Sequence, residues 1–134
     1  MIATWAGGMR FVNTSASGHA VVTDAPADKG GGGTAPSPME LVILGLIGCT
    51  GVDVVSILQK MRQPVVSCEV QATSERAEDH PLVYTRIHLV YILRGDLDPK
   101  KVQRAVDLSE KTFCSVSAML RGTAKITSEV RLNP

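Results

Sequence analysis

The chain has 134 residues, with 14 basic and 13 acidic side chains and a formal net charge of +1. This length is typical of one domain, here residues 1–134. The charges are scattered and form no basic run. Composition therefore gives no indication of nucleic-acid binding or of attachment to an anionic membrane. Aromatic residues make up only 4% of the chain, so we expect an aliphatic core.

The sequence has no feature of a secreted or membrane-spanning protein. The N-terminal segment lacks the layout of a secretory signal, and the apolar run at 41–47 is shorter than the ~20 residues of a membrane span. We therefore expect a cytoplasmic protein. The three cysteines should then be free or redox-active and not joined in structural disulfides. His19, His80 and His88 are scattered and no CxxC pair exists, so no metal site, zinc in particular, is expected.

The first third of the chain predicts strands and a loop. Residues 2–15 fit one strand bent at Gly7 and Gly8, and residues 18–23 fit a second. Arg10 is either a solvated charge or a cation that projects towards an acidic thiol. The segment 24–36 is a loop. Its four consecutive glycines bury too little apolar surface to become ordered, and a mobile lid is the functional alternative.

The segment 37–63 predicts a long buried helix. Ser37 and Glu40 form a capping box with Pro38 at the first helical position, and apolar residues then cover every side. Glycines at 45, 48 and 51 favour close approach of another backbone to one face. Such a helix is too apolar for a small monomer with one sheet. We therefore expect a homodimer in which two of these helices are buried together.

The rest of the chain predicts strands at 65–75 and 82–93, a helix capped by Asp98, a short helix ending at Gly122 and a strand at 123–132. Together these elements indicate an α+β fold with a mostly antiparallel sheet covered on one face. In the strand predicted at 65–75, one face is apolar and carries Val66, Cys68, Val70 and Ala72. Cys68 is therefore interpreted as a core residue.

Two cysteines lie in small, uncharged sequence beside helices, Cys49 and Cys114. A cation or a helix N-terminus makes a thiol nucleophilic by stabilising its thiolate. Cys114 is next to a helix N-terminus. Cys49 lies about three turns into its helix and needs a cation, for which Arg10 is the best candidate. Asp53, one turn later, would disfavour a Cys49 thiolate if it pointed that way. Cys49 as a small core hydrophobe is the alternative.

The run PSPMELVILGLIGCTGVDVVSILQKMR, followed downstream by EKTFCSVSAML, resembles the OsmC and organic hydroperoxide resistance (Ohr) family, most closely its OsmC-like branch. The resemblance covers nearly the whole chain. It implies an intertwined α+β homodimer with active sites at the dimer interface. It also implies a thiol peroxidase for organic hydroperoxides, with Cys49 as the peroxidatic and Cys114 as the resolving cysteine. An external dithiol would reduce the resulting disulfide, and neither a metal nor an organic cofactor is needed.

The resemblance also assigns further residues. The family's arginine partner comes from the N-terminal region, where Arg10 is the one arginine. In the hydroperoxide-resistance branch a glutamate directly follows the proline, but here Met39 does so and Glu40 comes one residue later. That shift turns the side chain by about 100°, so helix capping is the expected role of Glu40. The alternatives are a non-enzymatic dimer that binds a hydrophobic small molecule or partner, and a sulfur or thiol carrier that uses Cys49 alone.

Overall fold

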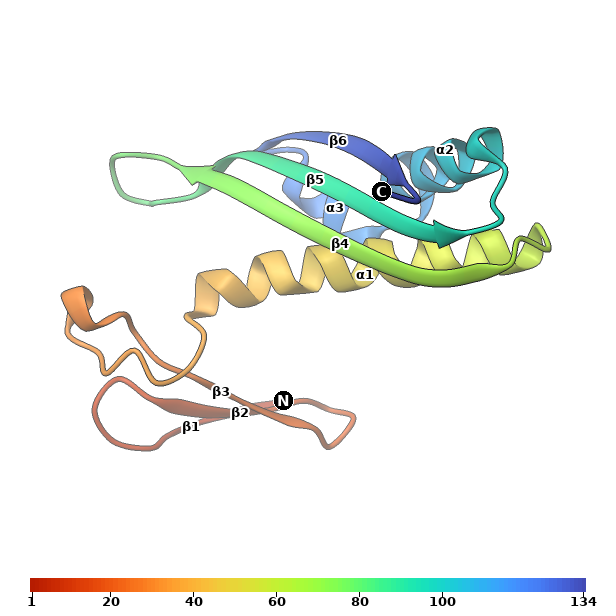
Figure 1. Cartoon of the computed structure of the whole chain (residues 1–134). Coiled ribbons are helices and arrows are strands. Elements are labelled where there is room, and N and C mark those ends of the chain that lie inside the picture. Colours follow the sequence, from red (N-terminus) through yellow and green to blue (C-terminus); the bar gives the residue numbers. More distant parts are fainter. The chain divides into compact units, whose positions relative to one another are not determined.

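The computed structural model describes all residues 1–134 and contains two compact units, Met1–Leu44 and Gly45–Pro134 (Figure 1). Helix α1 (Pro38–Lys60) begins in the first unit and ends in the second. Each unit has one three-stranded sheet, and three of the four strand pairings are antiparallel. The predicted α+β class with mostly antiparallel pairing is confirmed, although the strands form two sheets and not one.

The first unit holds an antiparallel sheet of β1 (Ile2–Trp5), β2 (Phe11–Thr14) and β3 (Ala20–Thr23). The prediction of one bent strand over residues 2–15 is wrong. Gly7 and Gly8 both adopt positive φ, at 90° and 58°, and the amide of Ala6 donates to the carbonyl of Arg10 at 2.9 Å. Two consecutive left-handed residues reverse the chain where a bulge would only bend it, so two strands form.

Asp24 organises the glycine-rich loop, which contains the short helix η1 (Ala27–Lys29). The buried Asp24 carboxylate accepts hydrogen bonds from the amide of Ala25 at 2.8 Å and from the amide of Gly32 at 3.4 Å. The amide and hydroxyl of Thr34 also donate to it, at 3.1 and 2.7 Å. These bonds, that of the Thr34 hydroxyl first, lower the pKa of Asp24 from its ordinary value. The prediction that the loop lacks order is wrong, because polar bonds supply what apolar burial cannot.

Helix α1 starts as predicted. The amide of Glu40 donates to the Ser37 hydroxyl at 3.2 Å, and the amide of Ser37 donates to the Glu40 carboxylate at 2.6 Å. The helix ends at Lys60, and Arg62 takes a positive φ of 57° before Pro64. Four residues of α1 are buried: Leu46, Thr50, Val54 and Leu58.

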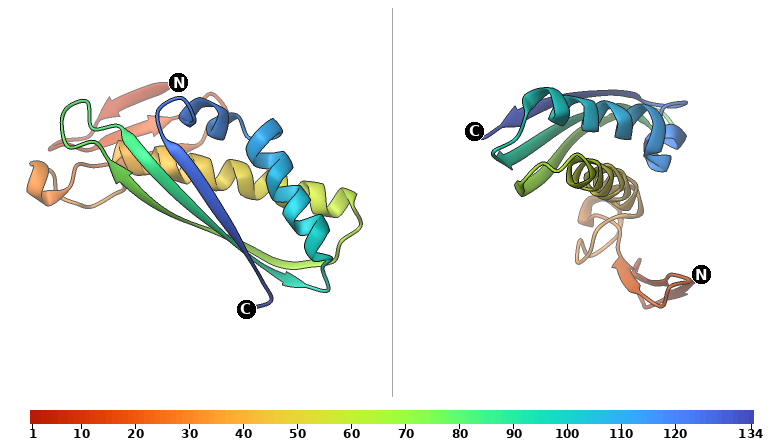
Figure 2. Two further views of the ribbon diagram at one scale, coloured as in Figure 1. Left: turned by 90° about the horizontal axis from the view of Figure 1, so that it is seen from above. Right: turned by 90° about the vertical axis from the view of Figure 1, so that its right-hand side faces the viewer.

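The second unit contains β4 (Val65–Arg76), β5 (Tyr84–Gly95) and β6 (Lys125–Leu132). β4 pairs antiparallel with β5, which pairs parallel with β6. One face of β5 carries buried side chains, Ile87, Leu89, Tyr91 and Leu93. Within this unit, α1 and α2 (Pro99–Leu108) lie beside the sheet, as two further views show (Figure 2).

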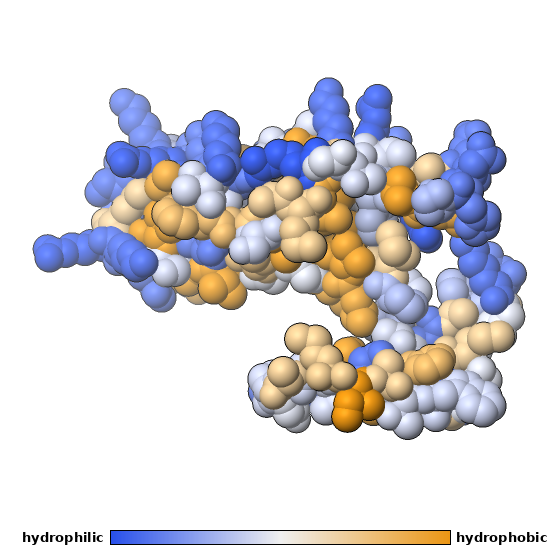
Figure 3. Space-filling view, turned by 180° about the vertical axis from the view of Figure 1, so that it is seen from behind, coloured by the Kyte–Doolittle hydropathy of each residue, from blue (hydrophilic) through white to orange (hydrophobic).

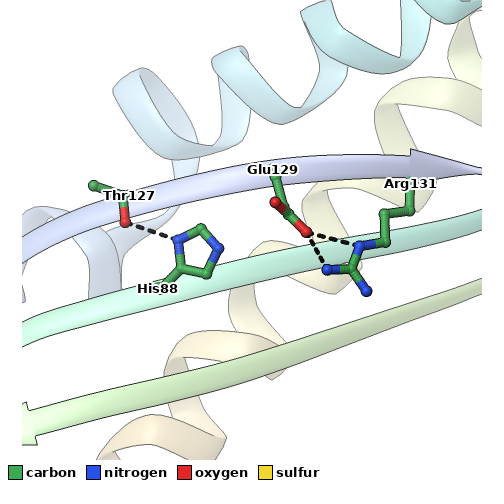
Figure 4. Close-up of polar contacts among 4 residues, drawn as sticks. All are labelled: His88, Thr127, Glu129 and Arg131. Atoms are coloured by element: carbon green, nitrogen blue, oxygen red, sulfur yellow. Dashed lines mark hydrogen bonds and ion pairs between the residues drawn. The ribbon is translucent and has the colours of Figure 1, made fainter.

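The other face of the sheet carries polar side chains, four of which are drawn in Figure 4. Here His88 and Thr127 are hydrogen-bonded at 2.8 Å, and Glu129 pairs with Arg131. The predicted alternation of β6, with one wet face, is confirmed. On β4 the predicted apolar face is wrong at Val66, which is 79% exposed. A register shift between Val65 and Ser67 inserts an extra residue there and turns Val66 outwards.

A π-helical turn connects the two C-terminal helices. Asp98 caps α2 as predicted and accepts from the amide of Lys100 at 2.8 Å. The chain then continues through η2 (Ser109–Phe113) to Cys114, the N-cap of α3 (Ser115–Leu120). The sequence did not indicate the π turn, which sets the positions of Ser109 and Cys114.

Candidate active site

The second unit brings together Cys49, Asp53 and Cys114. The two sulfur atoms and a carboxylate oxygen of Asp53 all lie within 4.8 Å of one another. Cys49 and Asp53 are one turn apart on α1 and are partly exposed, whereas Cys114 is only 2% exposed. The two thiols are therefore side by side, and the residue on α1 is the more exposed of the two.

Cys114 is held as a thiol. The amide of Ser117 donates to its sulfur at 3.4 Å, which favours the thiolate, as expected for a residue at a helix N-terminus. Burial has the larger effect and raises the pKa of Cys114, and neighbouring Cys49 raises it further through a side-chain hydrogen bond and charge. The expected activation of Cys114 by its helix is thus outweighed by burial.

A buried polar network supports the site. The Thr50 hydroxyl lies 2.7 Å from that of Tyr91 and 2.8 Å from that of Ser109. Ser109 donates to Asp53 Oδ2 at 3.0 Å, and Tyr91 donates to Glu110 at 3.0 Å. Thr50, Tyr91 and Ser109 are fully buried, so their hydroxyls can find partners only within the protein. The network ties α1, β5 and the end of α2 together around the Asp53 carboxylate.

Tyr91 remains neutral in this network. Burial chiefly raises the pKa of Tyr91 far above its ordinary value, and the carboxylate of Glu110 adds to the effect, while the bond to Thr50 opposes it. The phenol therefore keeps its proton and can donate to Glu110.

Asp53 has no cationic partner. The ion pairs of the chain are Arg86–Glu75, Lys111–Asp107 and Arg131–Glu129. The carboxylate of Asp53 instead receives one hydroxyl bond and faces two sulfurs. The sequence raised the question of where Asp53 points, and the structure directs it towards Cys49.

Comparison with known proteins identifies the family. The profile of the family described as OsmC-like protein matches residues 30–129. The chain belongs to the OsmC-like family. It is 49% identical to Protein YhfA of Escherichia coli over 124 residues, which are 92% of this chain and 90% of YhfA.

Solved structures agree with this OsmC-like assignment. A hypothetical protein from Aquifex aeolicus, 30% identical, has a TM-score of 0.82 and covers 99% of this chain and 96% of its own. An organic hydroperoxide resistance protein OsmC from Legionella pneumophila, 16% identical, has a TM-score of 0.71 and covers 96% and 94%. The OsmC-like α+β fold that the resemblance implied is confirmed, whereas the homodimer stays a prediction.

The other residues predicted for the site of this OsmC-like protein, and Cys68, are not members of the cluster of Cys49, Asp53 and Cys114. Arg10 is exposed, in the turn between β1 and β2 of the first unit, and its role towards Cys49 stays a prediction. Glu40 is engaged in the capping box with Ser37. Cys68 lies on β4, half-buried and outside the thiol cluster, and burial raises the pKa of its thiol.

Sequence reasoning missed the four network residues of the site: Thr50, Tyr91, Ser109 and Glu110. Thr50 and Tyr91 gave a weak signal, since each is a hydroxyl-bearing residue within an otherwise apolar run. Ser109 and Glu110 gave none, because only the π turn after α2 directs them inwards.

Proposed function

We propose that this OsmC-like protein is a thiol peroxidase that reduces organic hydroperoxides through a Cys49 sulfenate and a Cys49–Cys114 disulfide. One observation carries the proposal: the two sulfurs, far apart in the sequence, lie within 4.8 Å of each other, with Cys49 partly exposed. Structural neighbours named as organic hydroperoxide resistance proteins support the substrate class.

In the first step the Cys49 thiolate attacks one oxygen of the hydroperoxide, and the O–O bond breaks. The sulfur is oxidised to a sulfenic acid, while the peroxide is reduced to an alkoxide that takes up a proton and leaves as the alcohol. Arg10, the arginine of the N-terminal region, is the proposed cation that stabilises the thiolate.

In the second step the Cys114 sulfur attacks the Cys49 sulfenic acid, and an S–S bond forms as water leaves. The raised pKa of Cys114 suits the resolving role, because a thiol that keeps its proton does not compete for peroxide. An external dithiol then reduces the disulfide by exchange and is itself oxidised.

A homodimer is part of the proposal. By length and composition alone, helix α1 is long and apolar enough to span a membrane. Only 22% of its apolar 18-residue stretch is buried within the chain. Its exposed residues include Leu44 and Val52, and the second unit also exposes Phe113 and Met119. Hydrophobic side chains are also exposed on the face of the molecule that Figure 3 shows.

The glycines of α1 indicate what covers the apolar surface. Gly45 and Gly48 have nothing of this chain near the position of a side chain, so the chain itself does not explain them. A second copy of α1, approaching closely along these glycines, accounts for both the glycines and the exposed apolar side chains. Equilibrium sedimentation should give twice the monomer mass, and a monomer would refute this part.

The peroxidase is tested by turnover of cumene hydroperoxide with dithiothreitol as reductant. Cys49→Ser should reduce turnover to the uncatalysed background, because no other thiol takes its place. Cys114→Ser should still form the sulfenic acid but lose activity as it over-oxidises. Cys68→Ser is the matched control and should retain the wild-type rate.

Turnover that persists in Cys49→Ser would refute the assignment. A wild-type protein with unchanged thiols after exposure would favour the alternative, a dimer that binds a hydrophobic small molecule or partner without chemistry.

A further inference from the structure

The cluster of Cys49, Asp53 and Cys114 has a second chemical consequence. Its three donor atoms lie within 4.8 Å of one another, and each can carry a negative charge. No ion pair of the chain involves Asp53. A bound cation would relieve the repulsion between a Cys49 thiolate and the neighbouring carboxylate.

The donor set selects the kind of cation. Two thiolates and one carboxylate match zinc, which takes sulfur, nitrogen and oxygen ligands in tetrahedral sites. Magnesium and calcium require oxygen ligands and do not fit. Three protein ligands leave a fourth position for water, and the partial exposure of Cys49 and Asp53 allows access to it.

An independent observation is the hydrogen-bonded support behind Asp53. Ser109 donates to its Oδ2 at 3.0 Å, and the Thr50 hydroxyl lies 2.8 Å from that of Ser109. Both hydroxyls are fully buried. Metal-binding carboxylates are oriented by such outer hydrogen bonds.

We propose that the reduced protein binds one zinc ion per chain through Cys49, Asp53 and Cys114. Binding releases the two thiol protons and changes no oxidation state, and the disulfide form offers no thiolate to bind. The spacing of histidines and cysteines in the sequence argued against zinc, but the fold joins a pair that spacing could not reveal. If the proposed peroxidase activity holds, bound zinc also blocks peroxide attack at Cys49.

The test is a Co²⁺ titration of the reduced full-length protein under anaerobic conditions, without peroxide. One equivalent should produce thiolate-to-cobalt charge-transfer absorption, and Zn²⁺ should abolish it by displacement. Cys49→Ser and Cys114→Ser should lose the band, whereas Cys68→Ser should keep it. Ser109→Ala should weaken binding by about 10–100-fold, and Asp53→Asn by at least as much.

Circular dichroism of each variant separates loss of binding from loss of fold. Absence of the band in the wild type overturns the proposal, as does a band that survives in Cys49→Ser. Unchanged affinity in folded Asp53→Asn also overturns it, since binding would then need only the thiols. Because the titration contains no peroxide, its result stands apart from that of the turnover assay.

Discussion

Two aspartates, one in each unit, have opposite surroundings. The Asp24 carboxylate accepts four hydrogen bonds, from three backbone amides and one hydroxyl. The Asp53 carboxylate accepts one hydroxyl bond, from Ser109, and otherwise faces two sulfurs. A carboxylate has about four acceptor positions. Those of Asp24 are therefore used within its loop, while most of those of Asp53 remain available.

This difference separates a structural group from one available for chemistry. Asp24 satisfies the backbone of a loop that has little apolar surface, so its removal should affect stability. Asp53 has spare acceptor capacity beside two nucleophilic atoms, so its removal should affect reactivity and metal binding more than stability. Substitutions in the two units can test this contrast.

Of the substitutions considered, Gly31→Ala should cause the largest loss of stability, because it disrupts the loop that Asp24 organises. A Cβ at Gly31 would overlap the carbonyl group of Ala25, whose amide bonds to Asp24. The carbonyl oxygen and carbon of Ala25 belong to the backbone and not to a flexible side chain. The backbone must therefore move, at a cost of about 1–3 kcal/mol or more. Chemical denaturation and limited proteolysis measure the loss.

Gly30→Ala is the control for this change. Gly30 has positive φ, at 83°, which Gly31 does not, and its side-chain position is open. The expected cost is therefore only the left-handed strain, about 1–2 kcal/mol. Equal losses in the two variants would show that the contact with Ala25 is unimportant.

Asp24→Asn should lower the melting temperature more than Asp53→Asn. Both changes keep size and remove charge, but an asparagine at 24 presents an amide group to donors that need an acceptor. At 53 only the bond from Ser109 is at stake. The reverse order of melting temperatures would contradict the assigned roles.

Tyr91→Phe should lower the free energy of unfolding by about 1–2 kcal/mol, because it removes a buried hydroxyl bonded to Glu110 and Thr50. Urea denaturation gives the value. Thr127→Val serves as a control, since it removes one exposed bond to His88 and should change stability by no more than about 0.5 kcal/mol. An unchanged free energy of unfolding in Tyr91→Phe would mean that the network contributes nothing to stability.

Acidification should produce the smallest effect. The pKa of Asp24 is lowered from 3.8, so its contribution to stability is fully present above that value and is lost as the pH falls through the folded-state pKa. The melting-temperature gap between wild type and Asp24→Asn should therefore narrow as the pH falls below about 5. A gap that widens on acidification would contradict the assigned sign.

Local sequence patterns predicted much of the fold. The capping box at Ser37, the Asp98 cap and the alternation of β6 each depend on neighbouring residues, and all three are confirmed. The errors occurred where a few backbone angles decide the outcome. Gly7 and Gly8 reverse the chain instead of bending it, and a bulge at Val66 shifts the apolar face of β4.

The site was only partly predictable. Its two cysteines were found through resemblance to the family, but their proximity depends on the π turn before Cys114, which no local pattern indicates. The same holds for Ser109, which meets Thr50 and Asp53 only after the chain has folded. Contacts between distant segments require the tertiary structure.

The central claim is that Cys49 and Cys114 act together on a peroxide. The most direct measurement is mass spectrometry of the reduced protein after one equivalent of cumene hydroperoxide, followed by peptide mapping. We predict the loss of two hydrogen atoms and a single disulfide joining Cys49 to Cys114, with Cys68 still free. A disulfide that involves Cys68, or a protein whose three thiols are all unchanged, would contradict the account.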